Sequence, residues 1–299
     1  MTNTTIAEHP DFAPLVSVVI PCFNRIVKLR RAIESVLHQT ESSVEVIIVD
    51  DGSTEDVQGA LASIQDSRFR FVRLEENGGA AKARNRGMAE ARGRFLALLD
   101  SDDWWLPQKL EMQLKIVADR PVSDTNWLVY NKIVVRTLWG DFPNPLRGFD
   151  PDRDDLAYYF VVERNYMQTS GLLGPLALFK KYPFDEHLKR HQDFDLLLRM
   201  RADNVRLLYC ADENVIYDDT EYEGRISKAF RPGPTLDWMR KASRFMSRHV
   251  RSELYVYYLG VKMFRHGQYS GAFYIAVGVL LYPPMFIELC SKISSKLRS

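Results

Sequence analysis

Residues 95–104 read Phe95-Leu-Ala-Leu-Leu-Asp-Ser-Asp-Asp-Trp104, an apolar run that ends in three carboxylates within four positions. Such a run is typical of a strand buried on both faces of a parallel sheet, and open α/β sheets bind ligands at the carboxyl ends of their strands. Because like charges this close repel one another, a cation or a solvated turn should compensate them. A hard divalent cation fits, since it takes one or two carboxylates and lets a substrate diphosphate complete its shell. The alternative is a surface turn in which Asp and Ser cap the next helix.

Length and composition narrow the class of protein. The 299 residues are 46% hydrophobic and 26% charged, which suits one large globular α/β domain with or without an appendage. Lys plus Arg (40) balance Asp plus Glu (39) to a net charge of +1, so we expect no nucleic-acid partner. The three cysteines are far apart and show neither CxxC nor zinc spacing, which predicts a reducing compartment. The N-terminus lacks the pattern of a secretory signal, so we expect a cytoplasmic protein.

Apolar runs alternate with helical patterns in the first third of the chain. Strands are predicted over residues 16–20, 44–49, 68–74 and 94–99, with helices from an N-cap at Asn24, near residue 57 and over 80–91. This alternation indicates βαβ units and a parallel sheet. A helix over 106–117 and a strand over 127–135 follow, and residues 139–155, with three prolines, are predicted to form a long mobile connection.

A second acidic cluster, Asp50-Asp51, follows the apolar run that ends at Val49. In a parallel sheet, this cluster and the one at residues 100–103 would open on the same edge. That is the geometry of a nucleotide site in which one carboxylate contacts the base and another holds a metal on the phosphates. The alternative for Asp50-Asp51 is a β-turn with Gly52.

Five segments in order resemble the family-2 glycosyltransferases with the GT-A fold. They are Pro14-Leu-Val-Ser-Val-Val-Ile-Pro-Cys-Phe-Asn24, Glu45-Val-Ile-Ile-Val-Asp-Asp-Gly-Ser53, Asn77-Gly-Gly79, Ala83-Arg-Asn-Arg-Gly87 and Leu98-Leu-Asp-Ser-Asp-Asp-Trp104. The close match covers residues 1–110, and a looser one continues to residue 200. The resemblance implies an α/β class with a Rossmann-like, mostly parallel sheet flanked by helices. It also implies a nucleotide-sugar donor, a divalent cation and inversion at the anomeric carbon.

The resemblance also implies roles for residues that bind the nucleotide sugar. Asp51 matches the carboxylate that faces the base, with Asp50 beside it near the nucleoside. A carboxylate can accept the N3–H of uracil, which favours a uridine nucleotide. Pro21 and Phe23 occupy the first loop that contacts the nucleotide, and Arg84 stands where a basic residue approaches the diphosphate. The alternative for Arg84 is a solvated helix face.

The first acidic segment, Asp100-Ser101-Asp102, matches the DxD element of the family. By resemblance, Asp102 is the direct ligand of Mg²⁺ or Mn²⁺, and Asp100 and Ser101 approach the ribose or sugar of the donor. Asp103 would contact the acceptor or the diphosphate. Its alternative is to cap the following helix.

The general base of the family lies in an acidic motif at the start of a downstream helix. Residues 189–199 occupy that place, with Gln192-Asp193 where the family usually has Glu-Asp. Asp193 is therefore the candidate base, with an N-cap as its alternative. His191 is a candidate second contact for acceptor or diphosphate, and its alternative is a structural role.

The domain scheme places a flexible segment at residues 1–14, a glycosyltransferase domain at 15–230 and a C-terminal helical region at 231–299. The nucleotide-binding half of the domain is expected at 15–105 and the acceptor half at 106–230. Residues 271–287 carry no charge, Pro283-Pro284 would interrupt a helix there, and basic residues follow. Three alternatives stay open: a helical hairpin packed on the catalytic domain, a peripheral contact with the cytoplasmic face of the inner membrane, or a membrane span.

The sequence thus predicts an inverting transferase that moves a sugar from a nucleotide sugar to a hydroxyl of a glycan or lipid-linked acceptor in surface polysaccharide synthesis. The expected cofactor is Mg²⁺ or Mn²⁺. The alternative is a catalytically silent nucleotide-sugar-binding or scaffold protein of the same fold, favoured only by Gln192 in place of the usual acid.

Overall fold

The structure, a computed structural model, describes residues 14–220 and 232–297. These residues form two compact units. Unit 1 combines residues 14–148, 167–187 and 199–220, and unit 2 combines residues 149–166, 188–198 and 232–297. The predicted flexible segment up to residue 13 and the predicted boundary near residue 231 lie outside the described residues, so the domain scheme stays a prediction.

Within the described residues, unit 1 contains one sheet of nine strands in the order β3-β2-β1-β4-β8-β6-β9-β5, with β7 paired to β6. The strands are β1 (Val16–Cys22), β2 (Val44–Asp50), β3 (Phe69–Arg73), β4 (Phe95–Leu98), β5 (Trp104–Trp105), β6 (Trp127–Thr137), β7 (Gly140–Asn144), β8 (Leu172–Pro175) and β9 (Arg206–Asp218). Strands β1 to β4 run parallel, β9 runs parallel to β6, and β8 runs antiparallel to β4 and β6. The α/β class with a mostly parallel sheet is confirmed.

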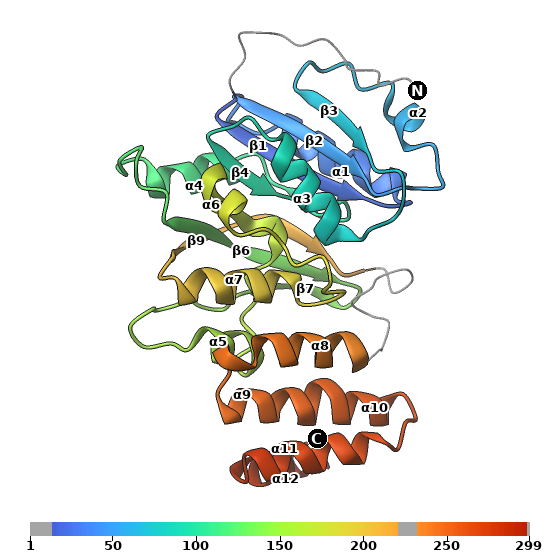
Figure 1. The fold of residues 1–299 in the computed structure, drawn as a ribbon, viewed down its shortest axis with the longest axis vertical. Helices are drawn as coiled ribbons and strands as arrows, with labels where there is room; N and C mark the ends of the chain where they lie inside the picture. The colour runs from blue at the N-terminus through green and yellow to red at the C-terminus, as the bar shows by residue number, and fades with distance from the viewer. Residues whose placement is uncertain (1–13, 221–231, 298–299) are drawn as a thin grey trace. The chain divides into compact units, whose positions relative to one another are not determined.

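Helices cover both faces of the parallel strands, which explains why these strands are apolar without alternation. The helix α1 (Ile26–Leu37) packs its buried side, including Leu29 and Ile33, in the same core cluster as Val18 and Ile20. The helix α3 (Ala80–Glu90) lies against the opposite, odd-numbered side chains: a Cβ at Gly87 would stand 2.3 Å from Val19 Cγ1. Figure 1 shows α1 and α3 alongside β1 and β2.

The first turn of α1 differs from the prediction. Asn24 was predicted to cap this helix, but the N-cap residue is Arg25, and Asn24 adopts a φ of 51°. The Asn24 side chain instead accepts hydrogen bonds from the backbone N–H groups of Thr54 (2.9 Å) and Glu55 (3.3 Å). Asn tolerates the left-handed region better than most residues, so it can tie the loop after β1 to the loop after β2.

The remaining helical segments of unit 1 are α2 (Val57–Leu61), α4 (Lys109–Val117), η1 (Thr169–Gly171) and α6 (Leu176–Lys181). The predicted mobile connection over residues 139–155 is wrong in its first part. Residues 140–144 form β7, which pairs antiparallel with β6. Gly140 has a φ of 130°, a conformation that only glycine adopts readily, and it opens this hairpin.

Unit 2 is helical. Its segments are α5 (Leu156–Val161), the first part of α7 (Gln192–Ala202), α8 (Pro232–Ala242), η2 (Ser243–Phe245), α9 (Arg248–Glu253), the π-helix η3 (Leu254–Val261), α10 (Lys262–Arg265), α11 (Gly271–Leu281) and α12 (Pro284–Leu297). Figure 1 shows α8, the α9–α10 row and α11 as successive layers. η3 and α11 approach closely because glycines lie where they meet: a Cβ at Gly271 would stand 2.5 Å from the Gly260 carbonyl oxygen.

The predicted interruption at Pro283-Pro284 is confirmed, since α11 ends at Leu281 and α12 begins at Pro284. Over residues 14–220 and 232–297, no helix combines the length and hydropathy that a membrane crossing requires. Cys22 and Cys210 are buried thiols, and Cys290 is an exposed thiol.

Candidate active site

The two acidic clusters emerge at the same edge of the sheet in unit 1. In the parallel register, Asp50 pairs with Cys22 at the end of β1, and Leu98 of β4 pairs with Val19. The backbone continues this pairing, because the Asp51 N–H donates to the Cys22 carbonyl at 2.9 Å. Both clusters therefore follow the carboxyl ends of parallel strands, β2 and β4, which flank β1 on either side, and open α/β sheets bind their ligands at such ends.

Asp50 is fully buried and holds the turn after β2. Its Oδ1 accepts the Ser53 N–H at 3.0 Å, and its Oδ2 accepts from Arg73 of β3 at 2.5 Å. Arg73 also donates to the Ser53 carbonyl at 2.7 Å. Asp50 thus shapes the loop after β2 through Ser53 and Arg73. In the same loop Gly52 adopts a φ of 69°, so the β-turn alternative concerns the same residues.

Asp51 organises the glycine pair that follows β3. One carboxylate oxygen accepts the Gly78 N–H at 2.8 Å and the other accepts the Gly79 N–H at 2.7 Å. A carboxylate has about four lone-pair positions on its two oxygens. The glycine contacts therefore fix the orientation of the carboxylate and leave acceptor capacity for a ligand.

The first loop carries Pro21 and Phe23 as predicted nucleotide contacts. Pro21 lies buried inside β1, whereas the Phe23 ring is exposed directly after the strand. Cys22 lies between them with its thiol buried. Burial raises the pKa of Cys22 to about 12, and the nearby Asp50 and Asp51 add to this shift. The thiol therefore stays protonated and inert at neutral pH.

The Asp100 carboxylate forms an ion pair with Arg84 of α3 at 2.6 Å. Arg84 is only 6% exposed, and its guanidinium lies over the Phe184 ring at 5.2 Å from the centroid. The alternative of a solvated helix face for Arg84 is therefore wrong. The side chain is positioned beside the acidic loop, where it can meet the charge of a phosphate group.

The Asp102 carboxylate forms an ion pair with Arg25 at 2.5 Å, with 13% of its side chain exposed. Its carbonyl oxygen accepts from Arg31 at 2.9 Å. Ser101, between the two acids, is buried. The two partly exposed carboxylates of this loop are thus Asp100 and Asp102. Arg84, inside α3, neutralises Asp100, and Arg25, at the N-cap of α1, neutralises Asp102.

Asp103 lies in the interior, with 1% of its surface exposed. It accepts hydrogen bonds from the Ser170 hydroxyl at 2.6 Å and from the Asp218 N–H at 3.1 Å. Burial, with added repulsion from Asp102 and Asp100, raises the pKa of Asp103 well above its usual range. The cap alternative is wrong, because Gln108 occupies the N-cap position of α4. Asp103 joins the acidic loop to η1 and β9.

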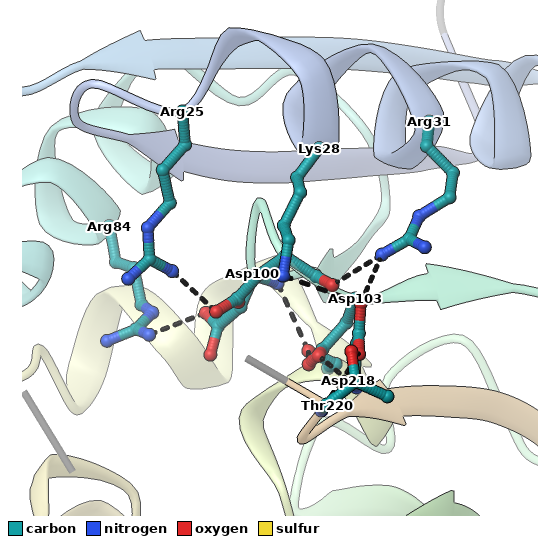
Figure 2. Close-up of polar contacts among 10 residues, drawn as sticks. Arg25, Lys28, Arg31, Arg84, Asp100, Asp103, Asp218 and Thr220 are labelled. Atoms are coloured by element: carbon teal, nitrogen blue, oxygen red, sulfur yellow. Dashed lines mark hydrogen bonds and ion pairs between the residues drawn. The ribbon is translucent and has the colours of Figure 1, made fainter. Parts of the chain in front are cut away.

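The sequence reasoning missed a row of cations on α1 and the acid that they meet. Figure 2 shows Arg25, Lys28 and Arg31 extending from one helix toward the acidic loop and Asp218. Arg31 and Lys28 approach the Asp218 carboxylate at 2.9 and 3.5 Å. The three-residue spacing of the cations places them on one side of α1, a signal that the sequence contained. Asp218, the last residue of β9, carries no local motif.

Asp218 stays ionised in this setting. Burial alone would raise its pKa, but hydrogen bonds from Thr220 and Arg31, helped by the charge of Lys28, outweigh burial and lower it. The Thr220 hydroxyl donates to the carboxylate at 2.6 Å. Asp218 therefore anchors the α1 cations at the end of β9.

The donor set fits a hard divalent cation that shares its shell with a substrate. Across the described parts of unit 1 and unit 2, no three His, Cys, Asp or Glu side chains form a group that could hold a metal alone. Mg²⁺ usually takes one or two carboxylates together with substrate phosphates. Asp102 and Asp100 supply such oxygens at the sheet edge, so the residues present fit the ion.

The candidate base lies in unit 2. The helix α7 begins at Gln192, so Asp193 stands inside its first turn, and the N-cap alternative is wrong. One Asp193 oxygen accepts the Phe194 N–H at 2.9 Å, and the side chain is partly exposed. The Gln192 amide, which replaces the usual acid, donates to the Leu188 carbonyl at 2.6 Å. A carboxylate at a helix N-terminus is stabilised by the helix dipole.

His191 also lies in unit 2 and packs against aromatic residues. Its ring stacks on Trp238 with centroids 4.5 Å apart, and its Nε2 lies 3.1 Å from Thr235 Oγ1. Burial lowers the pKa of His191 to about 3, with further lowering from Arg190 and Lys262. The imidazole is therefore neutral at physiological pH, which agrees with a structural role.

Comparison with known proteins defines the class. The family model described as glycosyl transferase family 2 matches residues 17–188, more than half of the chain. The chain therefore belongs to glycosyl transferase family 2, and its fold is of the GT-A type. A solved structure of S. aureus TarS, residues 1–349, in complex with UDP-GlcNAc has the same fold, with a TM-score of 0.61 at 19% identity over 84% of this chain and 72% of that chain.

Curated relatives carry glycosyltransferase names. A glycosyltransferase of Rickettsia typhi is 33% identical over 66% of this chain and 62% of its own length. TuaG of Bacillus subtilis, named for teichuronic acid biosynthesis, is 44% identical over 37% of this chain and 44% of its own. GlyG of Streptococcus pneumoniae is 28% identical over 79% of each chain. The chain thus spans less than two thirds of the Rickettsia and Bacillus relatives.

Proposed function

We propose that this glycosyltransferase moves a sugar from a UDP-linked donor to a hydroxyl of a glycan or lipid-linked acceptor, with inversion at the anomeric carbon and with Mg²⁺ or Mn²⁺ as cofactor. The observation that carries the proposal is that Asp51 and Asp102 lie at one edge of the sheet, after the parallel strands β2 and β4 that flank β1. Arg84, paired with Asp100, and Arg25, paired with Asp102, supply positive charge at this edge. One edge therefore offers a base contact, a metal ligand and diphosphate partners.

On the donor side, each residue has a distinct task. Asp51, held by Gly78 and Gly79, accepts the N3–H of uracil. Asp102 holds the cation, Asp100 approaches the ribose or sugar of the donor, and Arg84 contacts the diphosphate. When bound, the divalent cation stabilises the negative charge that grows on the leaving diphosphate. Arg84 adds to this stabilisation because its packing on the Phe184 ring already positions it.

For the acceptor, Asp193 is the proposed general base. Its carboxylate takes the proton of the acceptor hydroxyl as that oxygen attacks C1 of the sugar and the C1–O bond to the diphosphate breaks. Support comes from its place in the first turn of α7 and its partial exposure. Gln192 replaces an acid there, so Asp193 meets less like-charge repulsion from its neighbour.

The name of TuaG supports an acceptor in surface polymer synthesis, since the 112 shared residues are 44% identical.

We also propose that unit 2 contacts a membrane surface through α11. This helix has no charged residue, and Phe273 and Leu280 are exposed on it, as are Phe286 and Ile287 on α12. The sequence then continues with Lys292, Lys296 and Arg298. Exposed aromatic and aliphatic side chains beside basic residues favour a surface of anionic lipids.

A thermal-shift panel of UDP-, GDP- and dTDP-sugars, with and without Mn²⁺, tests the donor. We expect the largest shift with a UDP-sugar plus Mn²⁺, and hydrolysis of that donor that stops when the ion is chelated. Asp102→Asn should lose at least about 100-fold in rate, as expected for loss of a group that stabilises transition-state charge. Asp119→Asn, a change at an exposed aspartate of unit 1, is the matched control. Full activity of Asp102→Asn would reject the metal role.

The same assay tests the base. Asp193→Asn should reduce transfer to the acceptor by about 100-fold or more and leave the affinity for UDP unchanged. Asp237→Asn, on an exposed part of α8, serves as the control. If the wild-type protein binds the donor and never turns it over with any acceptor or water, the catalytically silent alternative that Gln192 suggests is favoured instead.

Co-sedimentation with vesicles tests the membrane contact. Vesicles that contain phosphatidylglycerol should retain the protein, and purely zwitterionic vesicles should retain much less. The double variant Phe273→Ser and Leu280→Ser should lose this binding, whereas Val122→Ser, at an exposed residue of unit 1, should keep it. Equal binding of the double variant and the wild type would reject this surface.

A further inference from the structure

The ion pair between Arg25 and Asp102 raises a question that the proposed function leaves open. Arg25 Nη1 lies 2.5 Å from Asp102 Oδ2, and the two side chains are 30% and 13% exposed. Asp102 is also the residue proposed to bind the divalent cation. The same carboxylate thus has two competing positive partners, one built into the chain and one from solution.

The two partners exclude each other at this carboxylate. A guanidinium at hydrogen-bond distance takes up one oxygen and places a positive charge where the ion would bind. A divalent cation beside that charge would be repelled, and the low exposure of Asp102 limits screening by water. The free protein should therefore bind the cation weakly until Arg25 moves.

Arg25 differs in its setting from the other two arginines at this site. Arg31 lies over the Trp104 ring at 3.7 Å and donates to Asp218, and Arg84 lies over the Phe184 ring. Arg25 stands at the N-cap position of α1, at the junction with the loop after β1, and Figure 2 shows it beside Arg84 on the same side of the acidic loop. A diphosphate brought to this edge offers Arg25 a stronger, bidentate anionic partner.

We propose that Arg25 is a built-in counterion for Asp102, which a nucleoside diphosphate draws away, so that the donor binds first and opens the metal site. This inference rests on the proposed metal role of Asp102. It assigns Arg25 two opposite effects: it lowers the affinity of the free protein for the cation, and it raises the affinity for the diphosphate. A residue that only stabilised the fold would not produce this pair of effects.

Titration with Mn²⁺, followed by electron paramagnetic resonance of the free ion, measures the first effect without turnover. In the absence of nucleotide, Arg25→Gln should bind Mn²⁺ more tightly than the wild type, by roughly 5- to 150-fold as for typical coupling between sites. Arg25→Lys keeps the charge and should stay near the wild type. Arg30→Gln is the matched control, because Arg30 on the same helix contacts Ser63 and the Ala60 carbonyl instead of the acidic loop.

Calorimetric titration with UDP in a metal-free buffer measures the second effect. Arg25→Gln should bind UDP several-fold more weakly than Arg30→Gln does. If Arg25→Gln binds both Mn²⁺ and UDP like the wild type, the counterion role of Arg25 is overturned. A parallel loss of both affinities, or a melting temperature far below that of Arg25→Lys, would assign Arg25 a structural role and overturn the proposal as well.

The double variant Arg25→Gln and Asp102→Asn separates this inference from the proposed function. Its Mn²⁺ affinity should fall back to or below the wild-type value if the gained ion sits on Asp102. If the double variant keeps the gain, the cation binds elsewhere, and the proposed metal role of Asp102 fails. If wild-type Mn²⁺ binding depends on Asp102 and UDP while Arg25→Gln changes nothing, the proposed function stands and only the inference about Arg25 fails.

Discussion

The buried residue Lys109 allows a test of the packing that holds Trp105 next to the acidic loop of residues 100–103. This residue opens α4, is 0% exposed, and its Nζ has no hydrogen-bond partner among the described residues. The ammonium position lies 3.7 Å from the centroid of the Trp105 ring. Trp105 in turn donates its indole N–H to the Ser170 carbonyl at 2.8 Å. Burial lowers the pKa of Lys109 well below its ordinary value.

The substitution Lys109→Met should stabilise the protein. A buried polar group without a partner costs about 1–3 kcal/mol in protein mutational data, and the contact with Trp105 returns about 0.5–2 kcal/mol. Methionine keeps the length of the side chain and its contact with the ring without the amine. We expect a net gain of about 1 kcal/mol, which corresponds to a rise of about 2 °C in melting temperature for a chain of this size.

The gain should depend on pH with a definite sign. Since the pKa of Lys109 is lower in the folded protein than in the unfolded chain, the unfolded chain binds more protons between these two values, and wild-type stability rises with pH there. The advantage of Lys109→Met should therefore be larger at pH 7 than at pH 10.

Chemical denaturation at both pH values measures this difference, with Lys115→Met as the control. Lys115 lies on the same helix with its side chain 60% exposed, and its replacement should change stability by less than about 0.5 kcal/mol. If Lys109→Met is destabilised at pH 7, or if its advantage grows toward pH 10, the Lys109 amine is paired or charged in the folded protein and the reasoning is refuted.

Three further outcomes follow from the structure. Asp50→Asn should lower stability by about 1–3 kcal/mol in urea unfolding, because it removes the charge-assisted bond to Arg73; an unchanged midpoint would contradict this. Because the pKa of His191 is about 3 against 6.5 ordinarily, the protein should lose stability as pH falls from 6.5 toward 3, and His191→Asn should lessen that loss in acid titrations. Gly87→Val should cost about 1–3 kcal/mol or more by thermal unfolding, since its Cβ would overlap Val19.

Much of the parallel half of the sheet could be predicted from local patterns. An apolar run without alternation requires cover on both faces, and α1 and α3 provide that cover. The acids at the ends of β2 and β4 had to meet at one edge once the strands were parallel, and the register confirms this. Asn24 was misassigned because its side chain bonds a loop that is 30 residues away in the sequence.

The rest depends on pairings between distant segments. β7 lay hidden in a proline-containing stretch, because an edge strand tolerates proline and carries little hydrophobic signal. Asp218 ends a strand without any motif, and its importance appears only through Lys28 and Arg31, which are 190 and 187 positions away. Ser170, which joins Asp100 and Asp103 through its hydroxyl, gave no signal for the same reason.

At the acidic loop, the need for charge compensation could be predicted from the sequence, whereas the groups that provide it could not. The sequence of residues 100–103 showed that its carboxylates need compensation, because three like charges so close are unfavourable. It could not show the source of that compensation, which the fold supplies as Arg84 for Asp100, Arg25 for Asp102 and burial with a raised pKa for Asp103. A site that is neutral before its ligand arrives must exchange partners when a cation and a diphosphate bind. Of the two arginines, only Arg25 is paired with the proposed metal ligand itself, so the order of binding should be decided at that ion pair.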